Sequence, residues 1–250
     1  IDDGSKNQCM SLQMLEIAAR SGTKAIFATP HVIERANKPS WEEIKEKTQQ
    51  LRQLCAEAQI DIMLYPGAEV QMNWELLPEL GATGAYCLNG GRYLLIELPA
   101  AEIPAYADEF WYELELKGIT PILAHPERYQ QLRENPDLLL LWRRRGMLMQ
   151  CNSGSFTGMF GSSVCENAKV LLANGLVDLL GSDGHRSEGR NTDMSRAAAV
   201  IRQLAGEEVL RQLTETNPQA ILKNQEIELK QPKVLLEDKP KSFWQKLFGK

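Results

Sequence analysis

Short apolar stretches alternate along the chain with longer segments in which apolar residues return every three or four positions. The short stretches have the pattern of β-strands and the longer ones that of amphipathic helices. Such alternation is typical of β/α units with parallel strands. The predicted strands lie at 24–29, 60–65, 92–98, 119–124, 147–151 and 177–182. The predicted helices lie at 11–21, 40–58, 103–117, 136–145, 166–174, 194–204 and 207–214.

The number of strands bears on whether the sheet is open or closed. The helix expected at 11–21 has no strand before it, although the alternation requires one. If one strand is missing upstream of Ile1, six strands become seven, and a closed β/α barrel is favoured over an open sheet. We therefore expect an α/β barrel whose first strand is absent from this chain.

Composition and charge narrow the class of protein. The chain has 250 residues, with 28 Lys and Arg against 33 Asp and Glu, which gives a formal net charge of −5. This balance gives no overall positive field for nucleic acid. No apolar run approaches the ~18 residues that a membrane span requires, which excludes an integral membrane protein. Five cysteines without a C-x-x-C pair favour a reducing, cytoplasmic location.

The pattern weakens near the C-terminus, so we expect a domain over 1–223 and a tail over 224–250 outside the core. Near its end the tail carries Phe243, Trp244, Leu247 and Phe248 on one helical side, among lysines. A basic amphipathic segment of this kind can contact an anionic membrane surface or a partner groove. A solvated, disordered end is the alternative.

Histidines and carboxylates follow the predicted strands. The chain has three histidines, and each comes just after such a strand, as do three carboxylates. Because the C-terminal ends of parallel barrel strands meet at one rim, these side chains are expected to converge there. Imidazole with carboxylate suits Mn²⁺, Fe²⁺ or Zn²⁺, and shared carboxylates permit more than one ion. The residues are His31, Glu69, Glu97, His125, Asp183 and His185.

Glu97 is the most informative of these residues because it ends the apolar run Leu94-Leu95-Ile96. A buried carboxylate without a partner costs several kcal/mol. A single histidine beside a strand is more often structural than a ligand. Six such residues at strand ends favour a metal site.

Six short strings then resemble the PHP (polymerase and histidinol phosphatase) superfamily in order and spacing. More closely, they resemble manganese-dependent protein-tyrosine phosphatases encoded in bacterial capsule and exopolysaccharide loci. The resemblance covers residues 1 to about 222. The strings are Ile1-Asp2-Asp3-Gly4, Ala28-Thr29-Pro30-His31, Gly67-Ala68-Glu69-Val70, Leu94-Leu95-Ile96-Glu97, Ala124-His125-Pro126-Glu127-Arg128 and Ser182-Asp183-Gly184-His185.

This resemblance implies a distorted (β/α)7 PHP-type, TIM-like barrel with two or three divalent ions, Mn²⁺ first, at its C-terminal rim. It implies that His125 and Glu97 bind one ion, which Glu69 bridges to a second ion that also takes Asp183. A third ion would be held by Asp3, His31 and His185, and phosphate would be bound by Arg128 and Arg190. The family's first strand carries an Asp-x-His-x-His motif that this sequence lacks. We therefore expect an N-terminally truncated and poorly active fragment.

The resemblance also implies the activity: hydrolysis of phosphotyrosine, with a bacterial tyrosine kinase as the protein substrate. One alternative is a phosphatase of a small metabolite such as histidinol phosphate or a sugar phosphate. Another is a catalytically impaired binding module. A cysteine-dependent phosphatase needs an Arg six positions after its thiolate, and no cysteine here has one. The loop at 152–158 is expected to be a rim loop near substrate, with a flexible connector as the alternative.

Overall fold

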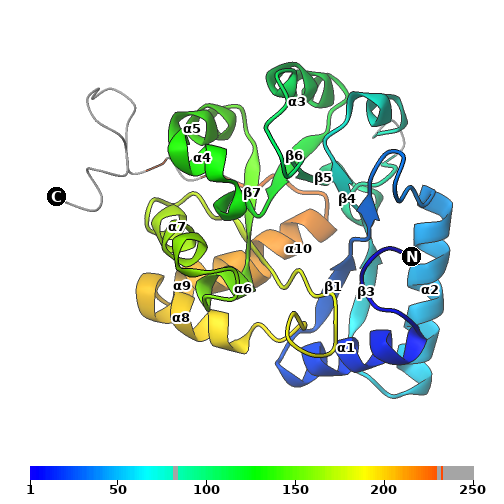
Figure 1. The fold of residues 1–250 in the computed structure, drawn as a ribbon. Coiled ribbons are helices and arrows are strands. Elements are labelled where there is room, and N and C mark those ends of the chain that lie inside the picture. The colour runs from blue at the N-terminus through cyan, green and yellow to red at the C-terminus, as the bar shows by residue number, and fades with distance from the viewer. Residues whose placement is uncertain (81–83, 230–231, 233–250) are drawn as a thin grey trace.

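The computed structural model describes residues 1–80, 84–229 and 232 (Figure 1). Its strands are all paired in parallel. Strand β1 (Ala25–Ala28) pairs with β3 (Met63–Pro66), and six further strands form one sheet in the order β2-β4-β5-β6-β7-β8. These strands are β2 (His31–Val32), β4 (Glu69–Gln71), β5 (Tyr93–Glu97), β6 (Thr120–Ala124), β7 (Leu148–Asn152) and β8 (Leu179–Gly181).

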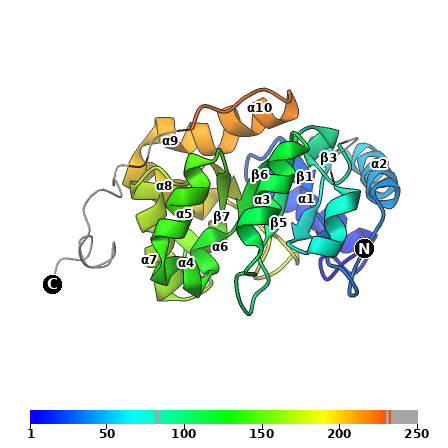
Figure 2. The ribbon, with the colours of Figure 1, turned by 90° about the horizontal axis from the view of Figure 1, so that it is seen from above.

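Helices surround the strands on the outside and at one end (Figures 1 and 2). The longer ones are α1 (Gln8–Arg20), α2 (Trp41–Glu57), α3 (Ala107–Leu116), α5 (Pro136–Arg144), α7 (Ser162–Ala173) and α8 (Ser195–Ala205). The shorter ones are α4 (Gln130–Glu134), α6 (Ser153–Phe156), α9 (Glu207–Arg211) and α10 (Asn217–Leu222). Short 3₁₀ turns lie at Trp74–Glu79, Leu88–Gly90 and Pro126–Arg128, and a π-turn lies at Gln212–Thr216.

Each predicted strand is found, but two strands that the pattern did not predict are also present. Strands β2 and β4 continue β1 and β3 after short breaks. Pro30, which has no N–H to donate, lies in the first break. Across the breaks the Gly67 N–H donates to the Ala28 carbonyl, and the Glu69 N–H donates to the Pro30 carbonyl. β1 and β2 therefore act together as one bent strand, and β3 and β4 act as a second. His31 and Glu69 thus lie within strands rather than after them.

The alternation of side chains along the strands divides the core into two layers. On β5, Leu94 and Ile96 face outward into the large core beneath the helices. Tyr93 and Leu95 face inward and pack with Ile122 in a smaller cluster. Glu97 comes next in the inward row, at the C-terminal end of the strand. The apolar filling of the half-barrel thus gives way to polar side chains at that end.

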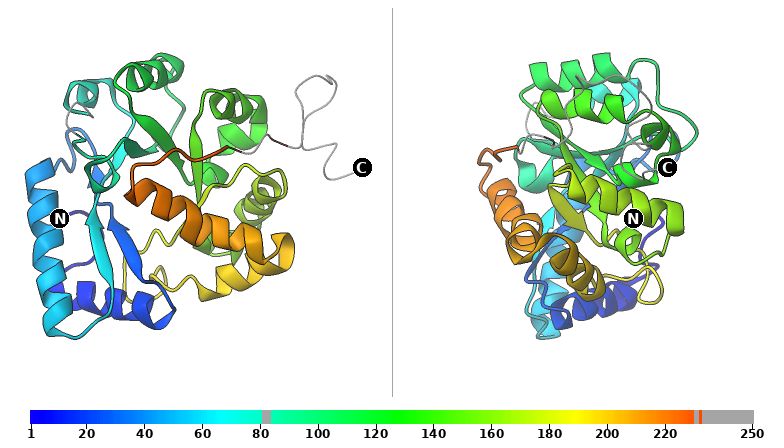
Figure 3. Two further views of the ribbon diagram at one scale, coloured as in Figure 1. Left: turned by 180° about the vertical axis from the view of Figure 1, so that it is seen from behind. Right: turned by 90° about the vertical axis from the view of Figure 1, so that its left-hand side faces the viewer.

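The opposite end of the half-barrel is closed by α10 and the residues after it. Ile221 belongs to the inner cluster, and Ile227 and Leu229 pack against it. The Tyr93 hydroxyl also donates to the Gln225 carbonyl. Figure 3 shows α10 running across this side of the strands. Ile227 and Leu229, which fall in the tail expected outside the core, therefore pack on the domain. The amphipathic segment expected near Phe243 lies outside the described residues.

The strands form a half-barrel, and its open side lies between β1 and β8. A cavity of about 920 Å³ separates the two edges and extends to the C-terminal rim. Among the described residues, β1 is paired only with β3 and β8 only with β7. The described part of the chain contains no helix long and apolar enough to cross a membrane.

Two adjacent leucines of α5 test the outer core. Leu140 is 2% exposed and Leu141 is 44% exposed. We expect Leu140→Ala to lower the free energy of unfolding by about 2–5 kcal/mol, because it leaves a cavity under the helix. The matched control Leu141→Ala should change it by less than about 1 kcal/mol. Urea unfolding measures both values, and equal losses would contradict the assignment of the buried face.

Candidate metal centre

Three neighbouring strands bring His31, Glu69 and Glu97 together at the C-terminal rim. His31 is the register partner of Glu69, and Glu69 is that of Leu95, two residues before Glu97. Because side chains two positions apart share a face, Glu69 and Glu97 both point inward. The His31 Nδ1 atom lies 3.3 Å from Glu97 Oε1. Glu69 and Glu97 are carboxylates held close to each other with little exposure to water.

His125 joins this group through an unusual backbone conformation. It follows β6 and has a φ of +38° in the left-handed region, which costs a non-glycine residue about 1–3 kcal/mol. The strand ends here, and the ring lies beside Glu69 rather than on the outer face. Its Nε2 atom is 3.0 Å from Glu69 Oε1 and 3.9 Å from Glu97 Oε2.

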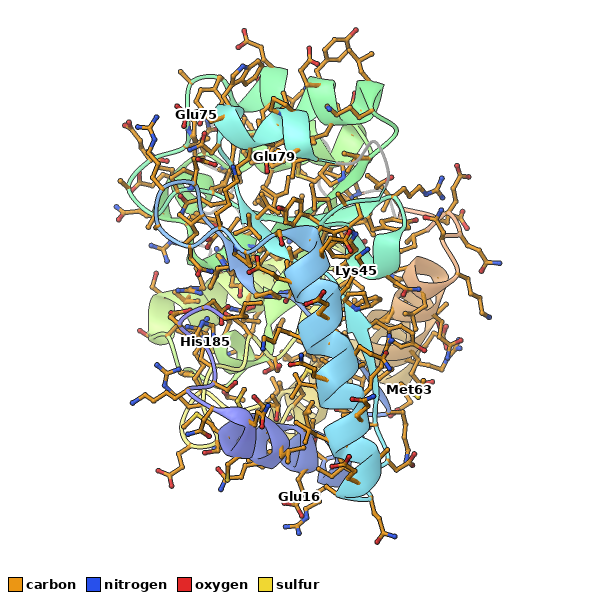
Figure 4. The ribbon with its side chains drawn as sticks, turned by 90° about the vertical axis from the view of Figure 1, so that its right-hand side faces the viewer. Glu16, Lys45, Met63, Glu75, Glu79 and His185 are labelled. Atoms are coloured by element: carbon orange, nitrogen blue, oxygen red, sulfur yellow. The ribbon has the colours of Figure 1, made fainter. Side chains whose placement is uncertain are left out.

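A second group consists of Asp3, His31 and His185. Asp3 Oδ1 lies 3.5 Å from His185 Nε2 and 3.9 Å from His31 Nε2. The two imidazole rings have centroids 5.8 Å apart. Figure 4 shows His185 beside the N-terminal segment, on the side of the molecule away from α10. His31 therefore belongs to both groups and links them.

Asp183 lies next to the second group and also has a left-handed backbone, with a φ of +51°. Its Oδ1 atom is 3.6 Å from His185 Nδ1. Its Oδ2 atom accepts hydrogen bonds from Arg128, Arg190 and Asn152. Two guanidinium groups from different loops thus share one carboxylate oxygen. Asp183 is in neither of the two sets of potential metal ligands that lie within 4.8 Å of one another among the described residues.

The donors present suit a divalent cation. Two sets of three side chains, Asp3 with His31 and His185, and His31 with Glu69 and Glu97, place one ligand atom each within 4.8 Å of one another. Clustered carboxylates with so little exposure are unfavourable without positive charge among them. Imidazole nitrogen with carboxylate oxygen matches Mn²⁺, Fe²⁺ and Zn²⁺. The residues present can therefore hold metal ions, because the ligand atoms within each set lie close enough together to contact one ion.

The carboxylates change the acid–base behaviour of two histidines. The interaction with Glu97 is the main cause that raises the pKa of His31 to about 9, with further contributions from Glu69 and Asp3 that together outweigh burial. Burial alone would lower the pKa of His125, but the hydrogen bond and charge of Glu69 outweigh it, so the pKa is raised. Without a cation, both imidazoles therefore favour the protonated form more than a free histidine does.

Several side chains that the sequence did not single out support the site. Asp2 accepts the His31 N–H through Oδ2 and the Gly4 N–H through Oδ1, both at 3.0 Å. Arg186 donates to the carbonyls of Asp3 and Gly4. These bonds fix the N-terminal segment that carries Asp3. The Asp-Asp-Gly string shows both acids, but not which of them faces the histidines.

Glu127 and Asn152 form a second support, beneath Asp183. Glu127 is fully buried, and its Oε1 accepts the Asn152 N–H at 2.9 Å and the Ser155 hydroxyl at 2.6 Å. Asn152 in turn donates to Asp183. The loop after β7 thus contacts a candidate ligand, which favours the rim-loop interpretation of 152–158. The sequence shows Glu127 between His125 and Arg128. It does not show that Glu127 is buried or which residues it contacts, because its partners lie 25 or more positions away.

Three of the five thiols do not have the environment of a nucleophile. Cys55, Cys87 and Cys151 are buried, and burial raises the pKa of each thiol, that of Cys87 to about 12. Of the other two cysteines, Cys9 is exposed and Cys165 is half-buried. A low-pKa thiolate of the kind used in catalysis is therefore not provided by the buried cysteines.

Fold and site together define a class: an α/β half-barrel of parallel strands whose C-terminal rim carries metal-type ligands and paired arginines. Residues 1–223 match the profile of the family described as capsular polysaccharide synthesis, CpsB/CapC. The chain belongs to this family.

Relatives of known name are similar over most of the chain. The tyrosine-protein phosphatase YwqE of Bacillus subtilis is 34% identical over 91% of this chain and 89% of its own. The tyrosine-protein phosphatase CpsB of Streptococcus pneumoniae is 28% identical over 90% of this chain and 95% of its own. A crystal structure from a study of YwqE and CpsB, described there as unique metal-dependent tyrosine phosphatases, superposes with a TM-score of 0.88 at 33% identity and covers 94% of each chain.

The raised pKa of His31 predicts proton release on metal binding. Below pH 9 the imidazole is mostly protonated, and a cation must displace that proton. We expect the apparent affinity for Mn²⁺ to rise about tenfold per pH unit between about pH 7 and about pH 8.5 for each proton released. Titration calorimetry in buffers of different protonation enthalpy measures the number of protons. His31→Gln should reduce it by about one, and a heat independent of the buffer would contradict the prediction.

Proposed function

We propose that this protein is a metal-dependent phosphoester hydrolase that removes phosphate from phosphotyrosine in proteins. One observation carries the proposal: imidazoles and carboxylates converge at the rim directly beside two arginines that share Asp183. A cation cluster next to paired guanidinium groups suits a phosphate ester, whose oxygens need several positive partners at once. The names of the similar proteins and of the superposed structure support the same activity.

We assign the metal ligands as a set of seven side chains that hold two or three divalent ions, with Mn²⁺ first and Fe²⁺ or Zn²⁺ as alternatives. His31 lies within reach of both ligand groups, so it is placed to border two neighbouring ions. When bound, such ions activate water for attack on phosphorus and offset the charge of the phosphoryl group. The ligands are Asp3, His31, Glu69, Glu97, His125, Asp183 and His185.

Arg128 and Arg190 bind and orient the phosphoryl group in this proposal. Each guanidinium presents a planar pair of N–H donors that matches two phosphate oxygens. Both side chains remain partly exposed, so a substrate can reach them. In the reaction, a water oxygen forms a bond to phosphorus, and the bond from phosphorus to the tyrosine oxygen breaks. The leaving phenolate has a conjugate acid with a pKa of about 10, so it departs more easily than an alkoxide.

The physiological substrate and the cellular setting are part of the same proposal. We propose a bacterial tyrosine kinase of capsule or exopolysaccharide synthesis as the phosphoprotein substrate. The family description supports a setting in capsule synthesis, and the relatives' names support a phosphotyrosine-containing protein as the substrate. We propose a cytoplasmic location, where the five free thiols would remain reduced.

We also propose that the complete fold is a (β/α)7 barrel of the PHP type, closed by a strand between β1 and β8. The two facing edges and the cavity of about 920 Å³ between them support this arrangement. A strand there would end at the same rim as the described strands, next to His31 and Asp183, which both line the cavity.

A comparison of substrates and two carboxylate variants tests the activity. We expect Mn²⁺-dependent turnover of phosphotyrosyl peptides with a kcat/KM at least about 100-fold above that for histidinol phosphate or sugar phosphates. Glu69→Gln should lower kcat/KM by about 100-fold or more, because the isosteric amide removes one negative ligand. The exposed Glu75 provides the matched control Glu75→Gln, which should retain full activity.

The other outcomes identify the alternatives. A preference for a small phosphate ester over phosphotyrosyl peptides would make the protein a metabolite phosphatase. Fewer than one metal ion per chain, together with no turnover of any phosphate ester, would make it a binding module. In either case the proposed activity would be rejected.

A further inference from the structure

Phe160 lies against both arginines of the site. The guanidinium carbon of Arg128 is 4.8 Å from the centroid of the Phe160 ring, and that of Arg190 is 5.6 Å from it. Arg128 follows β6, Phe160 follows α6, and Arg190 follows β8. One aromatic ring therefore contacts two cationic side chains from two other rim loops.

The Phe160 ring packs against α6, the helix that precedes it in the chain. A Cβ atom at Gly154 would lie 3.1 Å from Phe160 Cε2 and 2.9 Å from Met159 Sδ. The glycine thus lets this loop pack closely against the backbone of α6. The loop turns at Gly158 and Gly161, whose φ values of +81° and +94° favour glycine. The ring is therefore held against α6, while the neighbouring Met159 remains 48% exposed.

The two arginines need such a support because they repel each other. Both donate to the same Oδ2 atom of Asp183, which brings two positive charges close together. When Asp183 is used as a metal ligand, as proposed above, its negative charge is shared with a cation. The negative face of an aromatic ring attracts guanidinium groups and does not compete for the phosphate oxygens. Among the residues that the structure describes, Phe160 is the aromatic residue that lies within this distance of both groups.

We propose that Phe160 is a positioning residue that holds Arg128 and Arg190 together so that both can bind one phosphoryl group. This inference rests on the proposed function for its ligand, a phosphate ester, but the ring's role concerns phosphate binding and not turnover. The chemical step itself does not involve the ring.

Shape-matched variants separate the aromatic face from simple packing. We expect Phe160→Leu, which keeps an apolar side chain, to weaken the binding of inorganic phosphate to the Mn²⁺-loaded protein about tenfold. KM for a phosphotyrosyl peptide should rise by a similar factor, with a smaller change in kcat. Phe160→Tyr should stay within about twofold of the original chain, and so should Met159→Leu, the matched control on the same loop.

A series of fluorinated phenylalanines at position 160 tests the electrostatic role without a large change of shape. Each added fluorine weakens the negative face of the ring, so the affinity for phosphate should fall stepwise along the series. Metal content and thermal unfolding should stay constant. Equal affinity throughout the series, or full phosphate binding by Phe160→Leu, would overturn the inference.

The two readouts distinguish this inference from the proposed function. Phosphate affinity that follows the series without any turnover would reject the hydrolase and retain the role of Phe160. If phosphotyrosyl peptides are turned over at the same rate by every member of the series, the hydrolase would be retained and the role of Phe160 rejected.

Discussion

Electrostatic repulsion among converging carboxylates is the constraint on which the site depends. Glu69 and Glu97 face inward from neighbouring strands, and Asp183 lies at the same rim with 6% of its side chain exposed. Their mutual repulsion in a poorly hydrated place is unfavourable, and neighbouring histidines and arginines offset it. The negative charge around His31 raises its pKa to about 9, mainly through Glu97 and further through Glu69 and Asp3. A divalent cation would offset it more fully, because one ion places two positive charges among several oxygens.

The fold supplies this arrangement by a change in the character of its inward positions. Along β5 the inward row runs from Tyr93 through Leu95 to Glu97, so one strand provides both the apolar filling and a polar end. Because the strands are parallel, all such ends lie on the same side, and α10 closes the other side. At His125 and Asp183 the backbone takes a left-handed conformation that redirects the chain. The stability of the apolar core offsets the strain and the repulsion concentrated at the rim.

The sequence predicted those features that depend on local pattern. The alternation located the strands, and it also located the long helix α2, which begins with a capping box formed by Ser40 and Glu43. The convergence of histidines and carboxylates could be predicted from the sequence, because the C-terminal ends of parallel strands lie at the same rim. Strands β2 and β4 were missed because two or three residues are too few to show a period. The contacts from Glu127 to Asn152, and from Phe160 to the arginines, join loops far apart in sequence, and no spacing rule reveals them.

The supporting residues show that the rim is built as layers of side chains rather than as a row of ligands. Asp2 and Arg186 hold the segment that carries Asp3, while Glu127 holds Asn152, which contacts Asp183. A side chain on a loop loses more freedom when it is ordered than one on a strand, so loop residues need more bonds to stay in place. The strand residues Glu69 and Glu97 have few such supports because the ladder already fixes their backbone. Asp3, Asp183 and the two arginines lie on loops, and the additional buried or bonded partners are found next to them. The number of supporting contacts around a functional side chain therefore depends on whether a strand or a loop carries it.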